Sequence, residues 1–487
     1  MPLLLLLILF LSTSAADKSL DSQSLQLGTL PDASDDLSWS LDRTDAQTLV
    51  YSPNISSSSQ LSDLTLRLHH INSLMPANTT PTDFLHQRLH RDSARFSAIS
   101  RVKRKSHSRG SFSSAVISGL AHGSGEYFTR IGIGSPATNA YMVLDTGSDV
   151  VWIQCAPCRK CYSQTDPVFD PRKSKSFKHI TCSAPICQRL DASGCESKTK
   201  SCVYQVAYGD GSVTTGEFSK ETVTFEGGRR IGRVAFGCGH DNEGLFVAAA
   251  GLLGLGRGVL SFPSQAGRRG FGKRFSYCLV DRTSSVSRRL RSSTVIFGNG
   301  AIPRSHTGTI YTPLLTNPKL DTFYYVDLVG ISVGGKKVPG VLASDLSLNH
   351  ASGRGGVIVD SGTSVTRLAR PAYVALRDAF RIGTRTLKRT SGFSLFDTCY
   401  DLSGKTEVKV PTVVLHFLNT SKSKHSHSDM SLPASNYLIP VDTSGVFCFA
   451  FAGTDTGISI IGNIQQQGFR VVFDGARSRV GFSPNNC

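Results

Sequence analysis

Two aspartates stand in matching turns of the chain, 215 residues apart. Asp145 is followed by Thr-Gly-Ser and Asp360 by Ser-Gly-Thr, and each comes directly after an apolar run, 141–144 or 357–359. Such a run predicts a buried strand that ends at the aspartate. Two carboxyl groups brought together cannot both ionise, so one keeps a proton while the other is charged. The charged one can take a proton from water and the neutral one can give a proton to a carbonyl oxygen, which suits amide hydrolysis without a metal or a covalent intermediate.

The small residues around each aspartate have a use in such a site. Gly147 and Gly362 allow a tight turn that brings backbone N–H groups to the carboxylate. Hydroxyl side chains beside them, among them Ser148 and Thr363, can fix the orientation of the carboxyl groups. One Asp-Thr-Gly alone would be weak evidence, because these are ordinary turn residues.

The repetition extends beyond the turns. Two apolar residues and a glycine follow the aspartates by 107 and 100 residues, at 252–254 and 460–462. A constellation repeated at this distance indicates two related lobes, which can set the two carboxyl groups face to face. Glycine-rich turns between short strands favour all-β lobes. A helix is predicted over 371–380, where a proline suits the first turn and apolar residues share one face.

From Gly125 to the C-terminus these segments resemble the pepsin-type (A1) aspartic endopeptidases. Trp152 stands seven residues after Asp145, as in that family, and Tyr208 in Tyr-Gly-Asp-Gly-Ser matches the tyrosine of the flap, a mobile hairpin over the substrate. In that family the tyrosine hydrogen-bonds to the tryptophan. Asp149 is a departure, since pepsin has a serine there, and it could shift the acid profile.

Three further segments narrow the resemblance to plants. The cysteine-rich stretch after Trp152 is similar to the nepenthesin-like branch, and 237–246 and 396–400 resemble its "aspartic protease in guard cell" group. The resemblance implies a mainly β, bilobal pepsin-like acid protease fold, with two related β-barrel lobes and the active site in the cleft between them.

The resemblance also implies a function: a secreted aspartic endopeptidase, made as a zymogen and most active at acidic pH. By this resemblance, Asp145 and Asp360 would share a proton and activate a water, as the aspartate pair of that family does. The substrates would be polypeptides, and we expect a monomer that needs no cofactor and no metal. The residues implied in substrate binding and carboxylate orientation are Tyr208, Trp152, Ser148, Thr363, Gly147 and Gly362.

A different class of function stays open. Some plant proteins of this fold have lost the aspartate pair and act as inhibitors or binding proteins for cell-wall glycosidases. The chain would then be a catalytically silent member of the fold. The presence of both aspartates, Asp145 and Asp360, favours the enzyme.

The chain divides into a leader, a prosegment and two lobes. The segment 64–99 mixes apolar and basic residues and is similar to the propeptides of plant aspartic proteases. The basic run 101–105 could cover the aspartate pair in the precursor, could be a processing site, or could be a solvated run of charge. The expected organisation is 1–16 signal peptide, 17–115 propeptide, 125–298 N-terminal catalytic lobe with a Cys-rich insertion at 155–202, and 309–487 C-terminal catalytic lobe, the junction lying near 298–308.

The N-terminus predicts export. The apolar stretch 3–11 is too short to span a bilayer and is followed by small residues, as in a secretory signal peptide. We expect the protein to be extracellular, in the apoplast, with the vacuole as the other possible destination, and to have no stable membrane anchor. The formal net charge is +17, but the basic residues are dispersed without interleaved aromatic residues, so no nucleic-acid partner is expected; association with acidic wall polymers is a hypothesis.

The 12 cysteines predict disulfides, because the number is even and the leader indicates an oxidising compartment. The Cys-x2-Cys-x2-Cys run at 155–161 superficially suggests a metal or iron–sulfur site, which export disfavours. Spacing does not give the connectivity. The pairs implied by the resemblance are Cys155–Cys158, Cys161–Cys238, Cys182–Cys202, Cys187–Cys195, Cys278–Cys487 and Cys399–Cys448.

Two kinds of short motif complete the picture. Glycosylation sequons stand at Asn54, Asn78 and Asn419, of which only Asn419 lies in the expected mature part. Ser332 lies in a Gly-x-Ser-x-Gly pattern, but the residues after it predict a hairpin and not the helix that a serine-hydrolase elbow requires.

Overall fold

The computed structural model describes residues 20–28, 63–70, 80–99, 127–208, 212–225, 228–244, 246, 248–279, 293–303, 308–420 and 427–484. The expected signal peptide, the basic run 101–105, Asn54, Asn78 and Cys487 lie outside these residues, so those predictions stay open.

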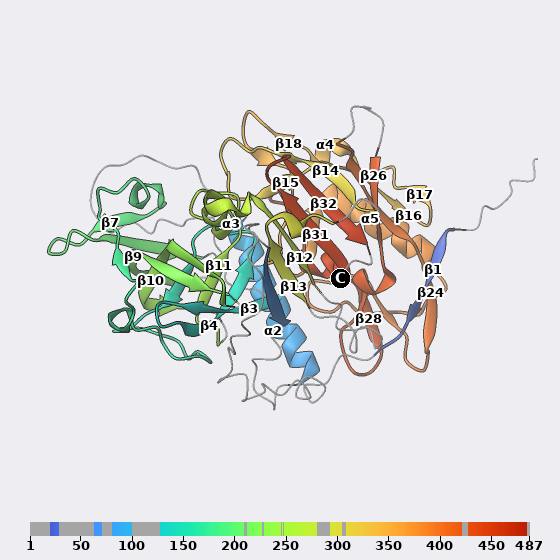
Figure 1. Ribbon diagram of the computed structural model, residues 1–487. Coiled ribbons are helices and arrows are strands. Elements are labelled where there is room, and N and C mark those ends of the chain that lie inside the picture. The colour runs from blue at the N-terminus through green and yellow to red at the C-terminus, as the bar shows by residue number, and fades with distance from the viewer. Residues whose placement is uncertain are drawn as a thin grey trace, which may run out of the picture.

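Short strands dominate both halves of the chain, and Figure 1 shows the halves as two lobes side by side. The predicted mainly β, two-lobed fold is confirmed. The strands of the N-terminal half are β3 (Tyr127–Ile133), β4 (Thr138–Asp145), β5 (Trp152–Gln154), β6 (Lys178–His179), β7 (Ser193–Cys195), β8 (Cys202–Ala207), β9 (Val213–Thr224), β10 (Arg230–Glu243) and β11 (Gly251–Gly254). Those of the C-terminal half are β15 (Tyr324–Val326), β16 (Leu328–Val333), β17 (Lys336–Lys337), β18 (Leu348–Asn349), β19 (Arg354–Gly355), β20 (Val357–Val359), β21 (Thr366–Ala369), β22 (Arg389–Thr390), β23 (Cys399–Asp401), β24 (Glu407–Pro411), β25 (Val413–Leu418), β26 (His427–Leu432), β27 (Leu438–Pro440), β28 (Val446–Phe449), β29 (Phe451–Thr454) and β30 (Ser459–Ile461).

A shared sheet joins the two lobes. Its strands pair in the order β2-β13-β12-β31-β32-β14, so the two lobes and the expected propeptide all contribute. β2 also pairs with β3 of the N-terminal lobe. The bounds are β2 (Leu64–His70), β12 (Arg274–Cys278), β13 (Thr294–Phe297), β14 (Ile310–Leu315), β31 (Phe469–Asp474) and β32 (Arg479–Pro484). A strand that precedes the mature enzyme in the predicted organisation is thus built into the sheet that holds the lobes together.

Helices are few and mostly short. The longest described one, α2 (Pro81–Ile99), lies between the two lobes in Figure 1. The helix expected over 371–380 is α5 (Arg370–Gly383), and its apolar face is buried as predicted. The others are α3 (Phe262–Ala266), α4 (Ala343–Leu346) and α6 (Asn463–Gln466). One more strand, β1 (Ser22–Gln26), pairs with β24 at the outer edge of the C-terminal lobe.

The disulfides correct four of the expected pairs. Cys155 follows β5, which runs parallel to β10, and this pairing brings Cys155 to Cys238 with their Cα atoms 5.3 Å apart. Cys158 is therefore left to bond Cys161. The expected bonds Cys155–Cys158 and Cys161–Cys238 are wrong because a contact between strands, not proximity in sequence, selects the partner.

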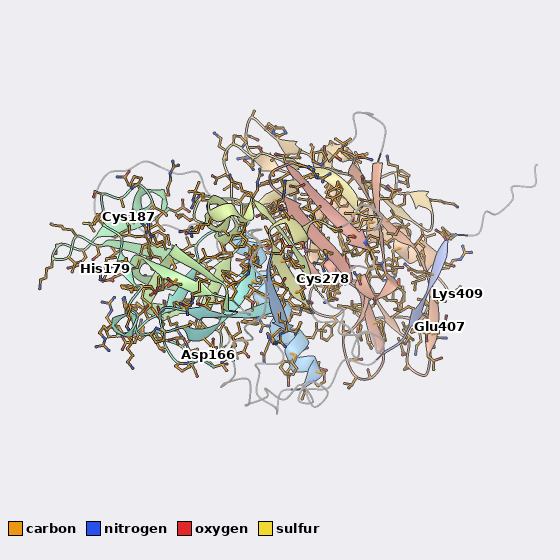
Figure 2. The ribbon with its side chains drawn as sticks, viewed as in Figure 1. Asp166, His179, Cys187, Cys278, Glu407 and Lys409 are labelled. Carbon is orange, nitrogen blue, oxygen red and sulfur yellow. A yellow bond between two sulfur atoms is a disulfide. The ribbon has the colours of Figure 1, made fainter. Side chains whose placement is uncertain are left out.

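The same holds in the insertion on the N-terminal lobe. Cys195 and Cys202 face each other across β7 and β8, but each bonds outward, Cys195 to Cys182 and Cys202 to Cys187. The expected pairs Cys182–Cys202 and Cys187–Cys195 are therefore exchanged. Figure 2 shows Cys187 in this insertion, away from the junction of the lobes.

In the C-terminal lobe one expected bond is present. Cys399 on β23 and Cys448 on β28 are directly opposite in the register, 4.0 Å apart at Cα, and are bonded as expected. Cys278 lies on β12, and its expected partner Cys487 is outside the described residues.

Candidate active site

The two aspartates end equivalent strands. Asp145 is the last residue of β4, which runs parallel to β11 and places Asp145 opposite Gly254. Asp360 follows β20, which runs parallel to β30, and its backbone N–H donates to the carbonyl of Ile461 at 3.1 Å. The two apolar-apolar-glycine segments singled out in the sequence therefore lie beside the two aspartates.

Each carboxylate is held by its own turn in the same way. The N–H of Gly147 donates to Asp145 Oδ1 at 2.9 Å, and the hydroxyl of Ser148 donates to Oδ2 at 2.6 Å. For Asp360 the donors are Gly362 N at 3.1 Å and Thr363 Oγ1 at 2.5 Å. Donors from a turn and a hydroxyl fix the plane of a carboxylate. The four small residues chosen from the sequence occupy these positions.

The two turns also bond to each other. The N–H of Ser361 donates to Thr146 Oγ1 at 2.8 Å, and the N–H of Thr146 donates to Ser361 Oγ at 3.2 Å. This reciprocal pair crosses from one half of the chain to the other, and all the groups are buried. The separation between the aspartates is thus set in part by bonds from the backbone of each turn to a hydroxyl of the other turn, and not by the aspartate side chains alone.

A cation from the segment expected to be the propeptide lies between the aspartates. Nη2 of Arg95, on α2, is 2.7 Å from Asp145 Oδ1 and 2.8 Å from Asp360 Oδ2. The guanidinium Nε also donates to Asp360 Oδ2 at 3.0 Å and to Thr363 Oγ1 at 3.1 Å. Because one nitrogen contacts both carboxyl groups, their oxygens can be no farther apart than the sum of those two contact distances. Sequence reasoning did not single out Arg95.

The electrostatics of the three groups follow from burial. Burial raises the pKa of Asp145 above its usual value, Arg95 opposes this and Asp360 adds to it. Burial lowers the pKa of Arg95, but the two aspartates raise it by more than burial lowers it. The guanidinium therefore stays charged. All three side chains have no exposed surface. A buried charge is tolerated when it is paired and hydrogen-bonded, which is the arrangement here.

Further contacts hold α2 against the C-terminal lobe. Asp92 is buried and accepts from the backbone N–H groups of Ser364 and Val365 at 2.5 and 3.0 Å. Its other oxygen is 2.8 Å from Nη2 of Arg367, whose guanidinium lies 4.5 Å from the ring of Phe96. The signal for this helix in the sequence was the mixture of apolar and basic residues over 64–99.

The flap residues lie together on the N-terminal lobe. The indole N–H of Trp152 donates to the hydroxyl of Tyr208, as the resemblance implied. The ring of Phe246 contacts both, with centroids 4.8 and 5.2 Å away. Burial raises the pKa of Tyr208 well above its usual value, so the hydroxyl keeps its proton and can donate. The hairpin tip itself, 209–211, is outside the described residues.

Asp149 bridges the two lobes behind the turn of Asp145. Its Oδ1 accepts from the N–H of Gly258 at 2.9 Å and its Oδ2 from the hydroxyl of Thr322, in the C-terminal half, at 2.7 Å. Burial raises the pKa of Asp149 to about 7, and the bond from Thr322 partly opposes this. A pocket beside it is lined by residues of the insertion, of β8 and of the segment around Thr322. The sequence flagged Asp149 only as a departure.

The remaining candidates do not join this site. Ser332 lies in β16, which continues through a hairpin into β17, so the serine-hydrolase elbow is absent, as predicted. Its hydroxyl is 2.7 Å from His416 Nε2, and His416 Nδ1 is 2.7 Å from Asp429, a row of contacts across the strands. Within the described ranges, no three His, Cys, Asp or Glu side chains converge to hold a metal ion.

Two family models cover most of the chain. The one described as "Xylanase inhibitor N-terminal" matches residues 127–299, and "Xylanase inhibitor C-terminal" matches residues 323–484. "Aspartyl protease family protein 2" of Arabidopsis thaliana is 62% identical over 88% of this chain and 86% of its own length. The chain belongs to the plant branch of the pepsin-like aspartic proteases.

Other members of this family agree with the resemblance seen in the sequence. "Protein ASPARTIC PROTEASE IN GUARD CELL 2" of Arabidopsis thaliana is 48% identical, covering 83% of each chain. "Aspartic proteinase nepenthesin-1" of Nepenthes gracilis is 38% identical over 77% of this chain and 81% of that protein. The prediction of an aspartic protease of the nepenthesin-like branch is therefore confirmed.

Solved structures support the fold. The chain is similar to the one titled "Crystal structure of edgp", with a TM-score of 0.60 and 21% identity over 88% of this chain and 96% of that one. It is also similar to "Crystal structure of Basic 7S globulin from soybean", with a TM-score of 0.56 and 21% identity over 74% and 94% of the two chains. In the part of the chain that the structure describes, no helix has the length and apolar character of a membrane span.

Proposed function

We propose that the chain is the precursor of a secreted aspartic endopeptidase in which Asp145 and Asp360 share one proton and activate one water. The observation that carries this proposal is that one nitrogen of Arg95 contacts both carboxyl groups. A position within hydrogen-bonding distance of both aspartates suits a single water once α2 has left. The symmetric donors around the two carboxylates support the same role for both.

The chemistry follows from the shared proton. The ionised aspartate takes a proton from the water as the water attacks the peptide carbonyl, and the neutral one gives a proton to the carbonyl oxygen. The pair titrates as a unit, so the proton belongs to the dyad and not to one named residue. Burial raises the pKa of Asp145, which favours a protonated carboxyl group in the pair in acid. Activity should therefore be highest in acid.

Several other residues take supporting roles in this proposal. Gly147, Gly362, Ser148 and Thr363 keep the carboxyl groups oriented through the bonds described above. The Tyr208 hydroxyl, supported by Trp152, closes the flap over an extended polypeptide between the lobes. No cofactor enters these steps, and cleavage beside bulky apolar residues is expected.

Arg95 makes the described form an inactive precursor in this proposal. It occupies the place of the water, and α2 fills the space between the lobes that a substrate would need. Covering the aspartate pair was one of the three roles left open for the basic run 101–105, which lies outside the described residues. Among the described residues, the cation that contacts both aspartates is Arg95. Acid favours its release, because protonation of an aspartate removes the charge that attracts the guanidinium.

The organisation of the chain completes the proposal. Residues 1–16 direct export to the apoplast or the vacuole, and 17–115 form the propeptide. The catalytic lobes are 125–298, with the insertion 155–202, and 309–487. The mature enzyme is a monomer that retains the glycan expected at Asn419, which lies just after β25.

The test uses the purified full-length chain incubated with a peptide library from about pH 3 to about pH 7, with and without pepstatin. We expect self-processing and pepstatin-sensitive cleavage in acid. Replacement of either aspartate, Asp145→Asn or Asp360→Asn, should abolish turnover, because the pair then lacks one ionisable carboxyl group. Appreciable turnover by either pure variant would contradict the mechanism.

The alternative is a catalytically silent protein that binds or inhibits cell-wall glycosidases. The descriptions of the matching family models raise it. Retention of both aspartates and of their donors argues for catalysis. The alternative would be favoured if the purified protein inhibited a xylanase and its acid-treated form cleaved no peptide.

A further inference from the structure

Strand β1 of the prosegment lies on the edge of the C-terminal lobe. It pairs antiparallel with β24 in an unbroken register from Ser22 opposite Pro411 to Gln26 opposite Glu407. Among the described strands, β24 pairs with β1 alone. Its backbone groups on this edge thus depend on a segment that precedes the predicted mature enzyme, and an unpaired strand edge readily accepts another strand.

Side chains on the inner face of β1 pack against the C-terminal lobe. Leu25 keeps only 6% of its surface exposed and packs into the main hydrophobic core beside Val408 and Val410 of β24. The amide of Gln23, two residues earlier, donates to the carbonyl of Leu432 at 3.0 Å and to the hydroxyl of Tyr437 at 2.6 Å. Removal of β1 would expose both an apolar surface and two polar groups that select a donor.

The contacts continue at both ends of the strand. The N–H of Thr412 donates to the carbonyl of Asp21 at 3.0 Å, and the N–H of Asp21 donates to the carbonyl of Gly334 at 3.2 Å. At the other end the N–H of Leu27 donates to the carbonyl of Thr406 at 2.9 Å. The site therefore accommodates seven residues of extended chain, 21–27, mostly through backbone bonds.

The outer face of the same pair is polar, and its place is remote from the aspartates. Glu407 and Lys409 alternate with the buried valines and are exposed. Figure 2 shows both at the outer edge of the C-terminal lobe, and Figure 1 shows α2 between the lobes. A polypeptide bound along β24 would thus lie outside the space between the lobes.

We propose that the edge of β24 is a second polypeptide-binding site, which holds an extended segment of a substrate once the prosegment has been removed. The proposal rests on the proposed function only in that removal of the prosegment empties the site. Addition of a strand to an exposed edge gives affinity through backbone hydrogen bonds and specificity through pockets for alternate side chains. The preferred segment carries a side-chain donor at the position of Gln23 and an apolar side chain two residues later, at that of Leu25.

The experiment opens this site in the full-length chain, independently of any catalysis. In Leu25→Asp a charge must enter the apolar core at the position of Leu25, so β1 should leave β24. A fluorescent synthetic peptide with the sequence of residues 19–28 is then added to the variant and to the unchanged chain, and binding is followed by anisotropy. We expect the peptide to bind the variant at least about tenfold more tightly than the unchanged chain, whose own β1 competes.

Two controls test whether the buried position of Leu25 decides the binding. Ser22→Asp introduces the same charge on the exposed side of β1 and should leave binding as weak as in the unchanged chain. A peptide with aspartate at the position of Leu25 should not bind the open variant. Hydrogen exchange at 407–412 should rise in Leu25→Asp and fall again when the unmodified peptide is added.

The outcomes separate clearly. Equal binding to all three chains, or no return of protection at 407–412 in the open variant, would overturn the proposal. If Leu25→Asp does not fold, the milder Leu25→Ser replaces it in the same measurements. If the chain showed this pattern of peptide binding but no peptidase activity, the proposed function would be refuted and the second binding site would be supported.

Discussion

Arg95 pairs with two buried carboxyl groups that would otherwise repel each other when both are ionised. Its fork of donors reaches Asp145, Asp360 and the hydroxyl of Thr363 at once. A guanidinium suits this place better than an ammonium, because its planar donors can serve two carboxylates and it does not lose its proton. In the proposed precursor, inhibition therefore depends on one side chain whose partners, the two aspartates, are themselves the groups that acid protonates.

The first prediction concerns this side chain. Arg95→Gln keeps a long polar side chain but removes the charge, which leaves the two aspartates uncompensated in the precursor. We expect self-processing at higher pH than in the unchanged chain, with a rate increase of about tenfold or more near pH 6. Gel analysis of the full-length band over time measures this.

His90→Gln on the same helix is the matched control, because His90 is exposed. It should process like the unchanged chain. A variant Arg95→Gln that is processed with an unchanged pH profile would show that the guanidinium does not hold the precursor inactive.

At this scale the sequence was informative about the aspartates and silent about their cation. Asp145 and Asp360 could be found because their neighbours in sequence are also their neighbours in space. Arg95 could not be found in this way, because nothing local distinguishes it from the other basic residues of the expected propeptide. The run at 101–105 is denser in positive charge. Its role follows from where α2 docks, which is a long-range contact.

At the scale of elements, α2 is held against the C-terminal lobe by Asp92 as well as by Arg95. Asp92 accepts from two backbone N–H groups just before β21 and pairs with Arg367 on that strand. All of these groups are buried or nearly so. The helix is therefore anchored by a buried carboxylate, and burial keeps water from replacing the groups that bond to it.

The second prediction is that Asp92→Asn loosens α2. The amide keeps the shape but offers only one acceptor and no charge, and the loss of one partner from a buried ion pair costs about 3–5 kcal/mol. We expect faster hydrogen exchange across 81–99 and easier proteolysis of the prosegment. Mass spectrometry of the intact precursor at neutral pH measures both.

Asp83→Asn in the first turn of α2 is the control, since Asp83 is exposed and, within the described ranges, its carboxylate accepts from the nearby hydroxyl of Thr80. Its exchange should match that of the unchanged chain. Equal protection of 81–99 in Asp92→Asn would contradict the anchoring role.

The third prediction concerns the strands that select the disulfides. Because β5 runs beside β10, a non-reducing digest should contain a peptide pair linked by Cys155 and Cys238, and a separate loop closed by Cys158 and Cys161. A fragment in which Cys155 is bonded to Cys158 would contradict the strand order. The sequence predicted short strands in this lobe, but it could not tell which strands would become neighbours.

At the scale of the whole molecule, Asp149 joins the turn of the first aspartate to the C-terminal half. Its two oxygens accept from Gly258 and Thr322, and the N–H of Arg257 donates to the carbonyl of Thr322 at 2.9 Å. The carboxyl group lies where the lobes meet, so its protonation bears on how they are held together.

The fourth prediction is a stability that falls toward neutral pH. The folded pKa of Asp149 is raised from 3.8 to about 7, so the folded chain binds this proton more tightly than the unfolded chain does. The resulting stabilisation is present below the unfolded pKa and is lost as pH rises through about 7. A shift of this size corresponds to at most about 4 kcal/mol, less for a half-buried residue.

Asp149→Asn should therefore flatten the dependence of the unfolding midpoint on pH and make the chain more stable than the unchanged one above about pH 7. Urea unfolding of both chains across acid and neutral pH measures the difference. Parallel curves for the two chains would show that Asp149 does not keep a raised pKa in the folded state.

The sequence by itself determined which turn residues bond to each aspartate, because a tight turn with its own donors is a local property of five consecutive residues. It also determined two β lobes, through the repeat of that turn and its apolar triplet. Only the tertiary structure decided that Arg95 lies between the aspartates, that Cys155 bonds Cys238, and that β1 occupies the edge of β24. Each of these depends on surfaces far apart in the chain that match in shape and charge only after the strands have paired.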